Sequence, residues 1–261
     1  MTDPTNTRPV APTRTAFPTT LWSRVREVGR PPHGPAETVD SERRTAQEAL
    51  FAAYWPPVYG YIRRKLAADH QRAADLTQDF FVHVLESELL AKATPARGRF
   101  RTFLKSCLEH HLIDDHRRMT ARKRGGHLHR ISDDDAMRIA EDRGLAELLA
   151  EPSTGPADVL DELWRRQLVE GALAQVEQEL RAEGRDVCWS VFAAYFLDDA
   201  STDYAALAAR YGVKPHDVSN HLRRAKQRYR ARLESMVMET VHDAGQLEEE
   251  LAWLFGRESN R

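Results

Sequence analysis

The sequence predicts an all-α protein in which two small helical domains are joined by an acidic linker, the C-terminal domain containing a helix-turn-helix. Apolar residues recur at three- and four-residue spacings, and no useful stretch shows the two-residue alternation of a strand. With 261 residues the chain is long enough for two modest domains, each with its own core. The charges favour this division, because two basic segments are separated by an acidic one although the net charge is only -2.

Shifts in composition divide the chain into five segments. Pro and Thr without periodicity predict a disordered tail, and an acidic stretch interrupted by Pro and Gly predicts a linker with at most short helices. The segments are the tail at 1–18, an N-terminal extension helix at 19–40, a first domain at 41–125, the acidic linker at 126–157 and a second domain at 158–256.

In the first domain, the apolar spacing predicts helices over 41–66, 74–90 and 100–119. Pro56 and Pro57 are expected to end or kink the first of them, because proline lacks the N–H that a helix interior requires. The expected core residues are Leu50, Phe51, Tyr54, Trp55, Val58, Tyr59, Ile62, Leu66, Leu76, Phe80, Phe81, Val84, Leu85, Phe100, Phe103, Leu104, Cys107, Leu108 and Leu112.

The second of these helices carries a polar, acidic patch. Asp75, Gln78 and Asp79 lie at i, i+3 and i+4, so they share the outer side of the helix. Three interpretations are open: a solvated helix face, a metal site that would need more ligands, and a docking surface for a basic partner.

A loop of arginines leads into the third helix, which ends in further basic residues. Arg99 and Arg101 flank Phe100, and Phe103 follows one turn later. Aromatic rings stack on bases and cations neutralise phosphates, so the pattern is typical of proteins that bind single-stranded or melted nucleic acid. The alternative is a helix C-terminus decorated with favourable cations, which accounts for the arginines at the end of the helix but not for those of the loop.

Histidines and aspartates cluster on the same helix at His110, His111, Asp114, Asp115 and His116. Pairs four residues apart could hold a metal in principle, as in a metal hydrolase. Successive helical residues point about 100° apart, however, so the five side chains cannot all converge. The sequence therefore predicts neither a metal nor another cofactor.

The stretch 203–232 is the most specific part of the sequence. A short helix with the apolar residues Tyr204, Leu207, Ala208 and Tyr211 is expected to end at Gly212, where glycine accepts a left-handed conformation. Pro215 suits the first turn of a second helix, because its missing N–H would be unsatisfied there. The last apolar segment, 236–255, is expected to close this domain.

The second helix of this pair has one apolar and one basic, amide-bearing side. Asn and Gln suit adenine, Arg suits guanine, and neighbouring cations neutralise phosphates, so this side is expected to lie in a major groove as the recognition helix of a helix-turn-helix. The alternative is a basic amphipathic helix pair packed in an ordinary bundle.

The two cysteines, Cys107 and Cys188, lie in apolar helical patterns without ligand spacing, as buried thiols of a reducing cytosol do. The sequence shows no secretory signal and no apolar run that could span a bilayer. We therefore expect a soluble, cytoplasmic protein without membrane partners.

Short motifs are spread along nearly the whole chain apart from its tail. They are FPTTLWSRV at 17–25, YWPPVYGYIRR at 54–64, DLTQDFF at 75–81, RGRFRTFL at 97–104, KRGG at 123–126, YAALAARYG at 204–212 and EEELAWLF at 248–255. In this combination the chain resembles a bacterial RNA polymerase sigma factor of the extracytoplasmic-function (ECF) group of the sigma-70 family. The resemblance implies a transcription initiation factor that has no catalytic activity of its own.

The resemblance also implies partners and roles for the two domains. A DxxQ[DE]xF motif grips the clamp helices of the largest polymerase subunit in that family, and here it consists of Asp75, Gln78, Asp79 and Phe81. The first domain would open and recognise the minus-ten element of promoter DNA through Arg97, Arg99, Phe100, Arg101, Phe103, Lys105, His110, Asp114, Arg117, Arg118, Arg122 and Lys123. The second domain would recognise the minus-thirty-five element through Lys214, His216, Ser219, Asn220, Arg223, Arg224, Lys226 and Gln227.

Some positions depart from the pattern of the family. His110 replaces the usual Asn, and Lys214 stands where a Ser or Thr cap is usual. Ala73 and Ala74 thin the acidic run before the docking motif, so a phosphorylated Thr77 could restore negative charge there. An anti-sigma factor or a Ser/Thr kinase is accordingly a candidate partner. The competing hypothesis is a stand-alone helix-turn-helix regulator, which would bind its operator tightly without polymerase.

Overall fold

The computed structural model describes residues 36–87, 89–92, 99–121, 143–198, 203–238, 240–241 and 243–256. Within these ranges the chain forms helices and turns but no strand, which confirms the all-α prediction for this part of the protein. None of the helices in these ranges is both long and apolar enough to cross a bilayer. The tail at 1–18, most of the extension at 19–40 and the first part of the linker at 126–157 lie outside the described residues.

The longest helix, α2 (Ala36–Leu66), runs without interruption through Pro56 and Pro57. The helix therefore does not end at these prolines, whereas the expected alternative, a kink at this point, stays a prediction. An interior proline costs about 3 kcal/mol in lost hydrogen bonding and steric conflict. Burial of the apolar side chains around the prolines offsets this cost, since Trp55 and Val58 are both buried in the core.

Three helices form the first group of helices together with α2. They are α3 (His70–Glu86), α4 (Leu89–Lys92) and α5 (Phe100–Ala121). The apolar residues that the sequence assigns to the core of α3 and α5 are buried in one cluster with those of α2, or are half-buried against it, as Leu85, Phe103 and Cys107 are. Leu66 at the end of α2 is exposed, so its assignment to the core was wrong. In α3, Asp69 caps the N-terminus by accepting a hydrogen bond of 2.8 Å from the amide of Arg72.

A short helix, α7 (Arg143–Ala150), and a long one, α8 (Pro156–Ala182), pack against α2. Gly60 lies where α2 meets both, close to Leu145 and Leu163. At the end of α2, Arg64 donates hydrogen bonds to the carbonyl oxygens of Leu149, Glu151 and Pro152. These bonds fix the turn between α7 and α8.

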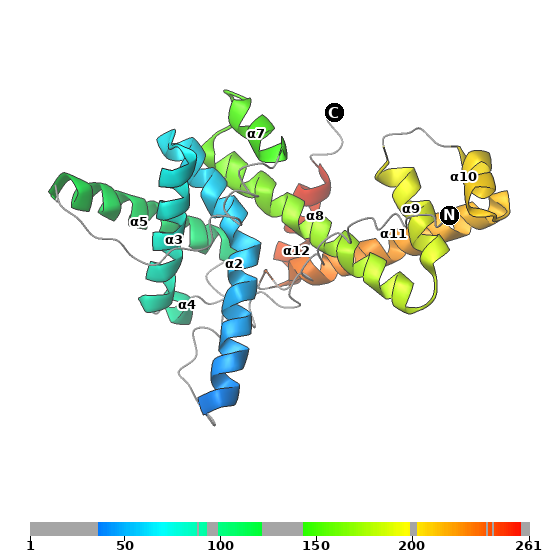
Figure 1. Cartoon of the computed structure of the whole chain (residues 1–261), viewed down its shortest axis with the longest axis horizontal. Helices are drawn as coiled ribbons and strands as arrows, with labels where there is room; N and C mark the ends of the chain where they lie inside the picture. The colour runs from blue at the N-terminus through cyan, green and yellow to red at the C-terminus, as the bar shows by residue number, and fades with distance from the viewer. Residues whose placement is uncertain are drawn as a thin grey trace, which may run out of the picture.

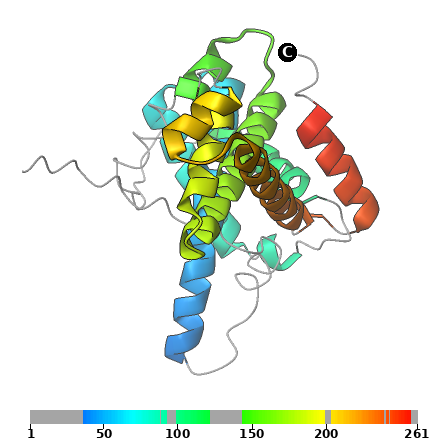
Figure 2. The ribbon, with the colours of Figure 1, turned by 90° about the vertical axis from the view of Figure 1, so that its right-hand side faces the viewer.

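The second group of helices lies at the far end of α8. It comprises α9 (Asp186–Phe196), α10 (Tyr204–Tyr211) and α11 (Pro215–Met238). Figure 1 shows α8 and α11 running lengthwise between this group and α2, α3 and α5, and Figure 2 shows them side by side from the end of the molecule.

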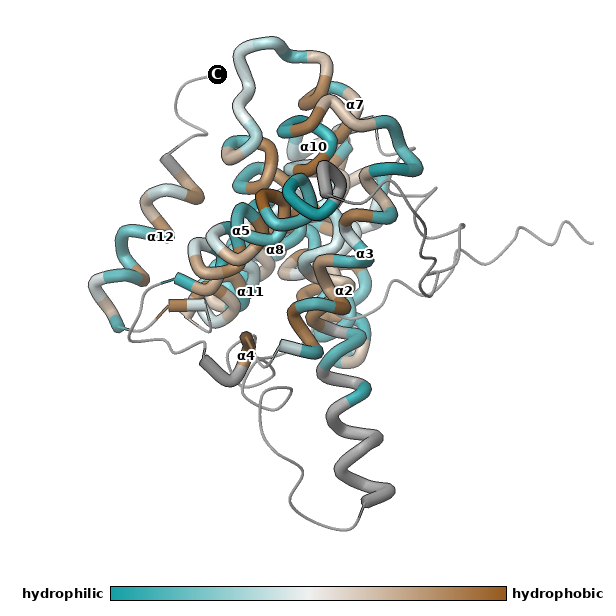
Figure 3. Tube along the Cα trace, turned by 90° about the vertical axis from the view of Figure 1, so that its left-hand side faces the viewer, coloured by the Kyte–Doolittle hydropathy of each residue, from teal (hydrophilic) through white to brown (hydrophobic). Residues whose placement is uncertain are grey.

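Two clusters of buried apolar residues form the interior, and α8 and α11 contribute to both. The tube view in Figure 3 shows apolar positions recurring along these helices. Leu163 of α8 belongs to the first cluster and Val176 to the second. The clusters thus share helices, and the domain boundaries expected from the sequence stay a prediction.

The last helix, α12 (Ala244–Gly256), packs on the first cluster through Leu254 and the half-buried Trp253. The sequence placed this segment with the second domain instead. Tyr204 is also exposed rather than buried, and its ring lies 5.6 Å from that of Tyr195. A helical stripe identifies a buried side but not the element that covers it, which explains the different position of α12. Tyr204 is the first residue of α10, where the side of the helix that carries the stripe is not covered.

Candidate nucleic-acid interface

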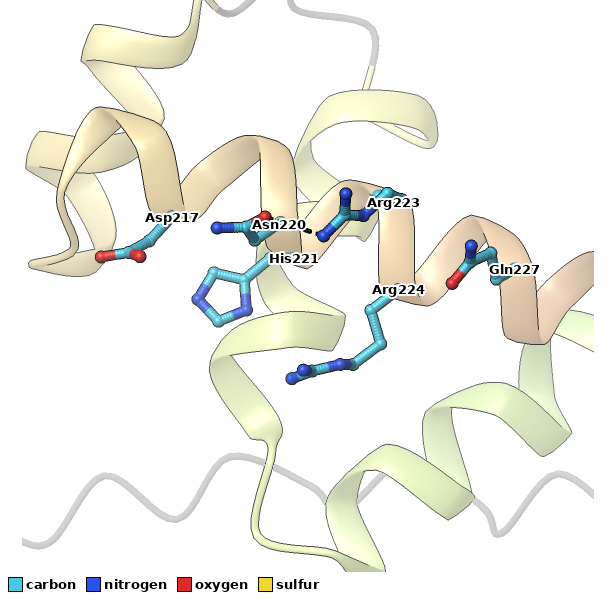
Figure 4. A pocket seen from close by; sticks show the side chains of 6 residues that line it. All are labelled: Asp217, Asn220, His221, Arg223, Arg224 and Gln227. Atoms are coloured by element: carbon cyan, nitrogen blue, oxygen red, sulfur yellow. Dashed lines mark hydrogen bonds between the residues drawn. The ribbon is translucent and has the colours of Figure 1, made fainter.

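Polar and basic side chains of α11 line a pocket of about 490 Å³ on the molecular surface (Figure 4). The lining residues are Asp217, Asn220, His221, Arg223, Arg224 and Gln227. Asn220 and Arg223 are joined by a hydrogen bond of 3.1 Å from the guanidinium to the amide oxygen. The amide and guanidinium groups that pair with base edges therefore lie together on one side of the helix.

Other arginines of α11 are held by carboxylates of the preceding helices. Arg228 makes two hydrogen bonds, of 2.6 and 2.8 Å, to Glu183 just beyond α8, and Arg232 pairs with Glu179. This Glu183 pair raises the pKa of Arg228 and lowers that of Glu183. The structure thus separates arginines that fasten α11 to the protein from those that it leaves on the surface.

A tight turn positions the exposed side of α11. Gly212 ends α10 in the left-handed conformation, with φ +65°, and the amide of Val213 donates to the carbonyl oxygen of Ala208. Asp203 begins α10 by accepting a hydrogen bond of 2.7 Å from the amide of Ala206. Val218 and Leu222 fasten the second helix into the apolar cluster behind it.

The other residues of α11 and its preceding turn that were predicted to contact DNA do not line the pocket. Lys214, His216 and Ser219 are exposed at the start of α11, and His216 lies 3.1 Å from Asp217. Lys226 points elsewhere, because its ammonium lies over the Phe196 ring, 5.1 Å from the centroid. The structure therefore brings most of the predicted side chains together and leaves Lys226 beside α9.

In the first domain, the outer side of α5 presents polar and basic residues. The members of the predicted set on this side, all exposed or half-buried, are Lys105, His110, Asp114, Arg117 and Arg118. Arg117 lies 3.5 Å from Asp114, one turn away on the same exposed side. Arg97, Arg122 and Lys123 fall outside the described residues.

The residues that begin α5 have a different environment. Phe100 is fully buried, Phe103 is half-buried, and the rings lie 6.0 Å apart. The guanidinium groups of Arg99 and Arg101 contact carboxylates of α12. Sequence reasoning missed the partners of these arginines, although the acidic composition of the last helix was a signal of charge complementarity.

The polar patch of α3 is present and includes a further carboxylate. Asp75 and Asp79 are exposed and Gln78 is half-buried. Partial desolvation raises the pKa of Asp79, and the neighbouring carboxylates of Asp115 and Asp75 raise it further. Asp115, which comes from α5, therefore belongs to this surface, although spacing along a single helix could not reveal it.

Two residues of the docking motif point inward. The ring of Phe81 is 2% exposed and stacks on that of Trp55 at 5.7 Å, so the structure does not bring Phe81 to the surface of the patch. Thr77 is 0% exposed, and its hydroxyl donates a hydrogen bond of 2.7 Å to the carbonyl oxygen of Ala73. A kinase therefore cannot reach the Thr77 hydroxyl in this conformation.

The histidine and aspartate cluster does not converge. Among the described residues, no group of three or more His, Cys, Asp or Glu side chains could hold a metal ion. His111 lies inside, against Phe80 and His83, and burial lowers its pKa to about 4. His110 is exposed on the outer side of the helix.

Comparison with known proteins bears on the first domain. Residues 50–122 match the family model Sigma-70 region 2, a segment that includes all of α3 and all of α5. Searches of curated proteins and of solved structures gave no match. Region 2 is a domain of transcription factors rather than of a known enzyme family. The match therefore supports the assignment of this protein as a sigma factor of the sigma-70 family. It also supports a role in promoter-specific transcription initiation, with binding to core RNA polymerase and to promoter DNA.

Proposed function

We propose that this protein is a transcription initiation factor of the ECF group that binds core RNA polymerase, directs it to specific promoters and assists promoter melting. The region 2 match over residues 50–122 carries this proposal. It covers both the acidic patch of α3 and the exposed basic residues of α5. The matched segment thus has two exposed surfaces. The acidic patch of α3 suits a protein partner, and the basic residues of α5 suit nucleic acid.

The patch of Asp75, Gln78 and Asp79 is the proposed contact with the clamp helices of the largest polymerase subunit. Its exposed carboxylates would pair with basic side chains of that partner. The raised pKa of Asp79 supports this role, because partial desolvation and the carboxylates of Asp115 and Asp75 outweigh the nearby arginines, and a basic surface would relieve this repulsion.

The exposed residues of α5 are the proposed contact with the minus-ten element. Arg117 and Arg118 would neutralise phosphates of the melted strand. A base that leaves the stack would lose a few kcal/mol of stacking and pairing energy, which contacts with the protein must offset.

We assign the minus-thirty-five element to a helix-turn-helix formed by α10 and α11. The short turn at Gly212 and the joined pair of Asn220 and Arg223 support this assignment. Arg228 and Arg232 have structural partners, so base recognition falls to the pocket residues. Each good bidentate contact with a base contributes about 1 to 3 kcal/mol of discrimination.

Run-off transcription with purified core polymerase and candidate promoters tests the proposal. We expect transcripts only when the protein, core enzyme and a cognate promoter are all present. The Asp79→Arg variant should lose co-purification with core enzyme while keeping its fold, whereas Glu147→Arg, an equal change of charge on the exposed side of α7, should retain it. Tight, sequence-specific operator binding without polymerase would instead support a stand-alone regulator.

A further inference from the structure

Carboxylates of α12 form ion pairs with the two arginines that flank Phe100 at the start of α5. Nη2 of Arg99 lies 2.8 Å from Oε2 of Glu249, and its Nε lies 3.0 Å from Oε2 of Glu250. Arg99 and Glu249 are 150 residues apart in the sequence. The acidic helix α12 therefore returns to the start of α5.

Arg101 is the buried anchor of this contact. Its Nη2 donates to Oε2 of Glu250 at 3.1 Å, and its Nη1 lies 3.0 Å from Oε1. The guanidinium lies over the rings of Trp164 and Trp253, at 4.8 and 4.3 Å from their centroids. The side chains of Arg101 and Glu250 are only 9% and 1% exposed, so this pair is part of the core.

Arg99 differs from Arg101 in its access to solvent. Its side chain is 28% exposed, and its partner Glu249 is 71% exposed. An exposed ion pair forms and breaks at little cost in free energy, whereas separation of a buried pair leaves a charge without compensation. Arg99 is thus the arginine of the two that another anion can reach.

Carboxylates and phosphates use the same donors of a guanidinium group. Arg99 already faces carboxylates with two of its five N–H donors, those on Nη2 and Nε, so a phosphate that binds the same edge of the guanidinium must compete with them. We propose that α12 is an intramolecular cover that competes with nucleic-acid phosphates for Arg99, held in place by Arg101, Glu250 and Trp253. This inference rests on the proposed function, in which the segment around Arg99 contacts DNA.

The competition can be measured with two variants that each remove one negative charge from α12. Glu249→Gln removes a partner of Arg99, and Glu248→Gln is the matched control, since Glu248 is exposed and pairs with neither arginine in the described part of the chain. The probe is a fluorescent oligodeoxythymidine of about 15 nucleotides, a length within the site sizes of single-strand binders. Fluorescence anisotropy of the full-length variants gives the affinities.

Glu249→Gln should bind the probe about two- to fivefold more tightly than the wild type at low salt, as expected for loss of one exposed ion pair. Glu248→Gln should bind it as the wild type does. The difference should disappear at high salt, where exposed charges are screened.

Equal affinities of Glu249→Gln and Glu248→Gln for the probe at low salt would overturn the cover. If run-off transcription succeeds in that case, the proposed function stands without it. If transcription fails but Glu249→Gln still binds the probe more tightly than its control, the cover stands and the proposed function is lost. Thermal unfolding of both variants checks that neither change alters the fold.

Discussion

Gly60 of α2 and Leu163 of α8 approach so closely that a Cβ on residue 60 would lie 2.4 Å from Cδ1 of Leu163. The same Cβ would lie 3.0 Å from Cγ1 of Val159. Glycine at this position therefore allows the first domain to pack against α8. The close contact fastens the N-terminal half of α8 to α2 within the first apolar cluster.

Gly60→Ala should lower the free energy of unfolding by about 1 to 3 kcal/mol, because the added methyl group overpacks the contact with Leu163. The better helix propensity of alanine offsets about 1 kcal/mol of this loss. Urea denaturation followed by circular dichroism measures the change. Adding Leu163→Ala should cost the Gly60→Ala protein less than it costs the wild type, and additive losses would show that the two residues are not coupled.

Asp79→Asn should stabilise the isolated protein slightly and weaken its binding to core polymerase. The folded state raises the pKa of Asp79, so the charged carboxylate opposes folding and its contribution to stability falls as pH rises through that pKa. Asp79 is exposed, so the gain at neutral pH should stay below about 1 kcal/mol. Thermal unfolding and co-purification measure the two effects, and a variant that loses stability would contradict the explanation.

His111 should make the protein sensitive to mild acid. Its pKa is lowered to about 4 in the folded state from an ordinary value of 6.5, so protonation favours unfolding. The stability present above pH 6.5 is lost as the pH falls towards 4, and this histidine alone accounts for about 2 kcal/mol at pH 5. His111→Phe should show a smaller loss between pH 7 and pH 5 in urea denaturation, and an equal loss would exclude His111 as the cause.

Asn220→Ala and Arg223→Ala should each cost about 1 to 3 kcal/mol of discrimination between cognate and scrambled promoter duplexes. The matched control is Arg228→Ala, which removes an arginine of the same helix that is bound to Glu183. That variant should retain discrimination, because Arg228 already has a partner in the protein. Electrophoretic mobility shifts with core polymerase measure the ratios, and equal losses on both duplexes would show that Asn220 and Arg223 contact only phosphates.

The sequence predicted the helices of the first domain well because each has one apolar side. The apolar spacing in α3 and α5 identified Leu76, Phe80, Leu104 and Leu108, and all four are buried. Spacing along one helix also identified the outer patch of α3. It could not show that Asp115 joins that patch, because the meeting of two helices is a tertiary event.

Other features depended on contacts between distant segments. The sequence did not reveal that Trp164 and Trp253 enclose Arg101, since these residues come from three separate helices. Local propensity also failed at Pro56 and Pro57, where burial of the neighbouring side chains keeps α2 continuous. In both cases, packing outweighs the preference of the local sequence.

Helix α8 consists of 27 residues, which makes it about 40 Å long. Its two ends lie in different apolar clusters, near α5 and near α11 respectively (Figure 1). Such a helix fixes both the distance between the two clusters and their relative orientation. One residue inserted at its middle would rotate one end by about 100° relative to the other, so only whole turns could be added without misaligning the two basic surfaces.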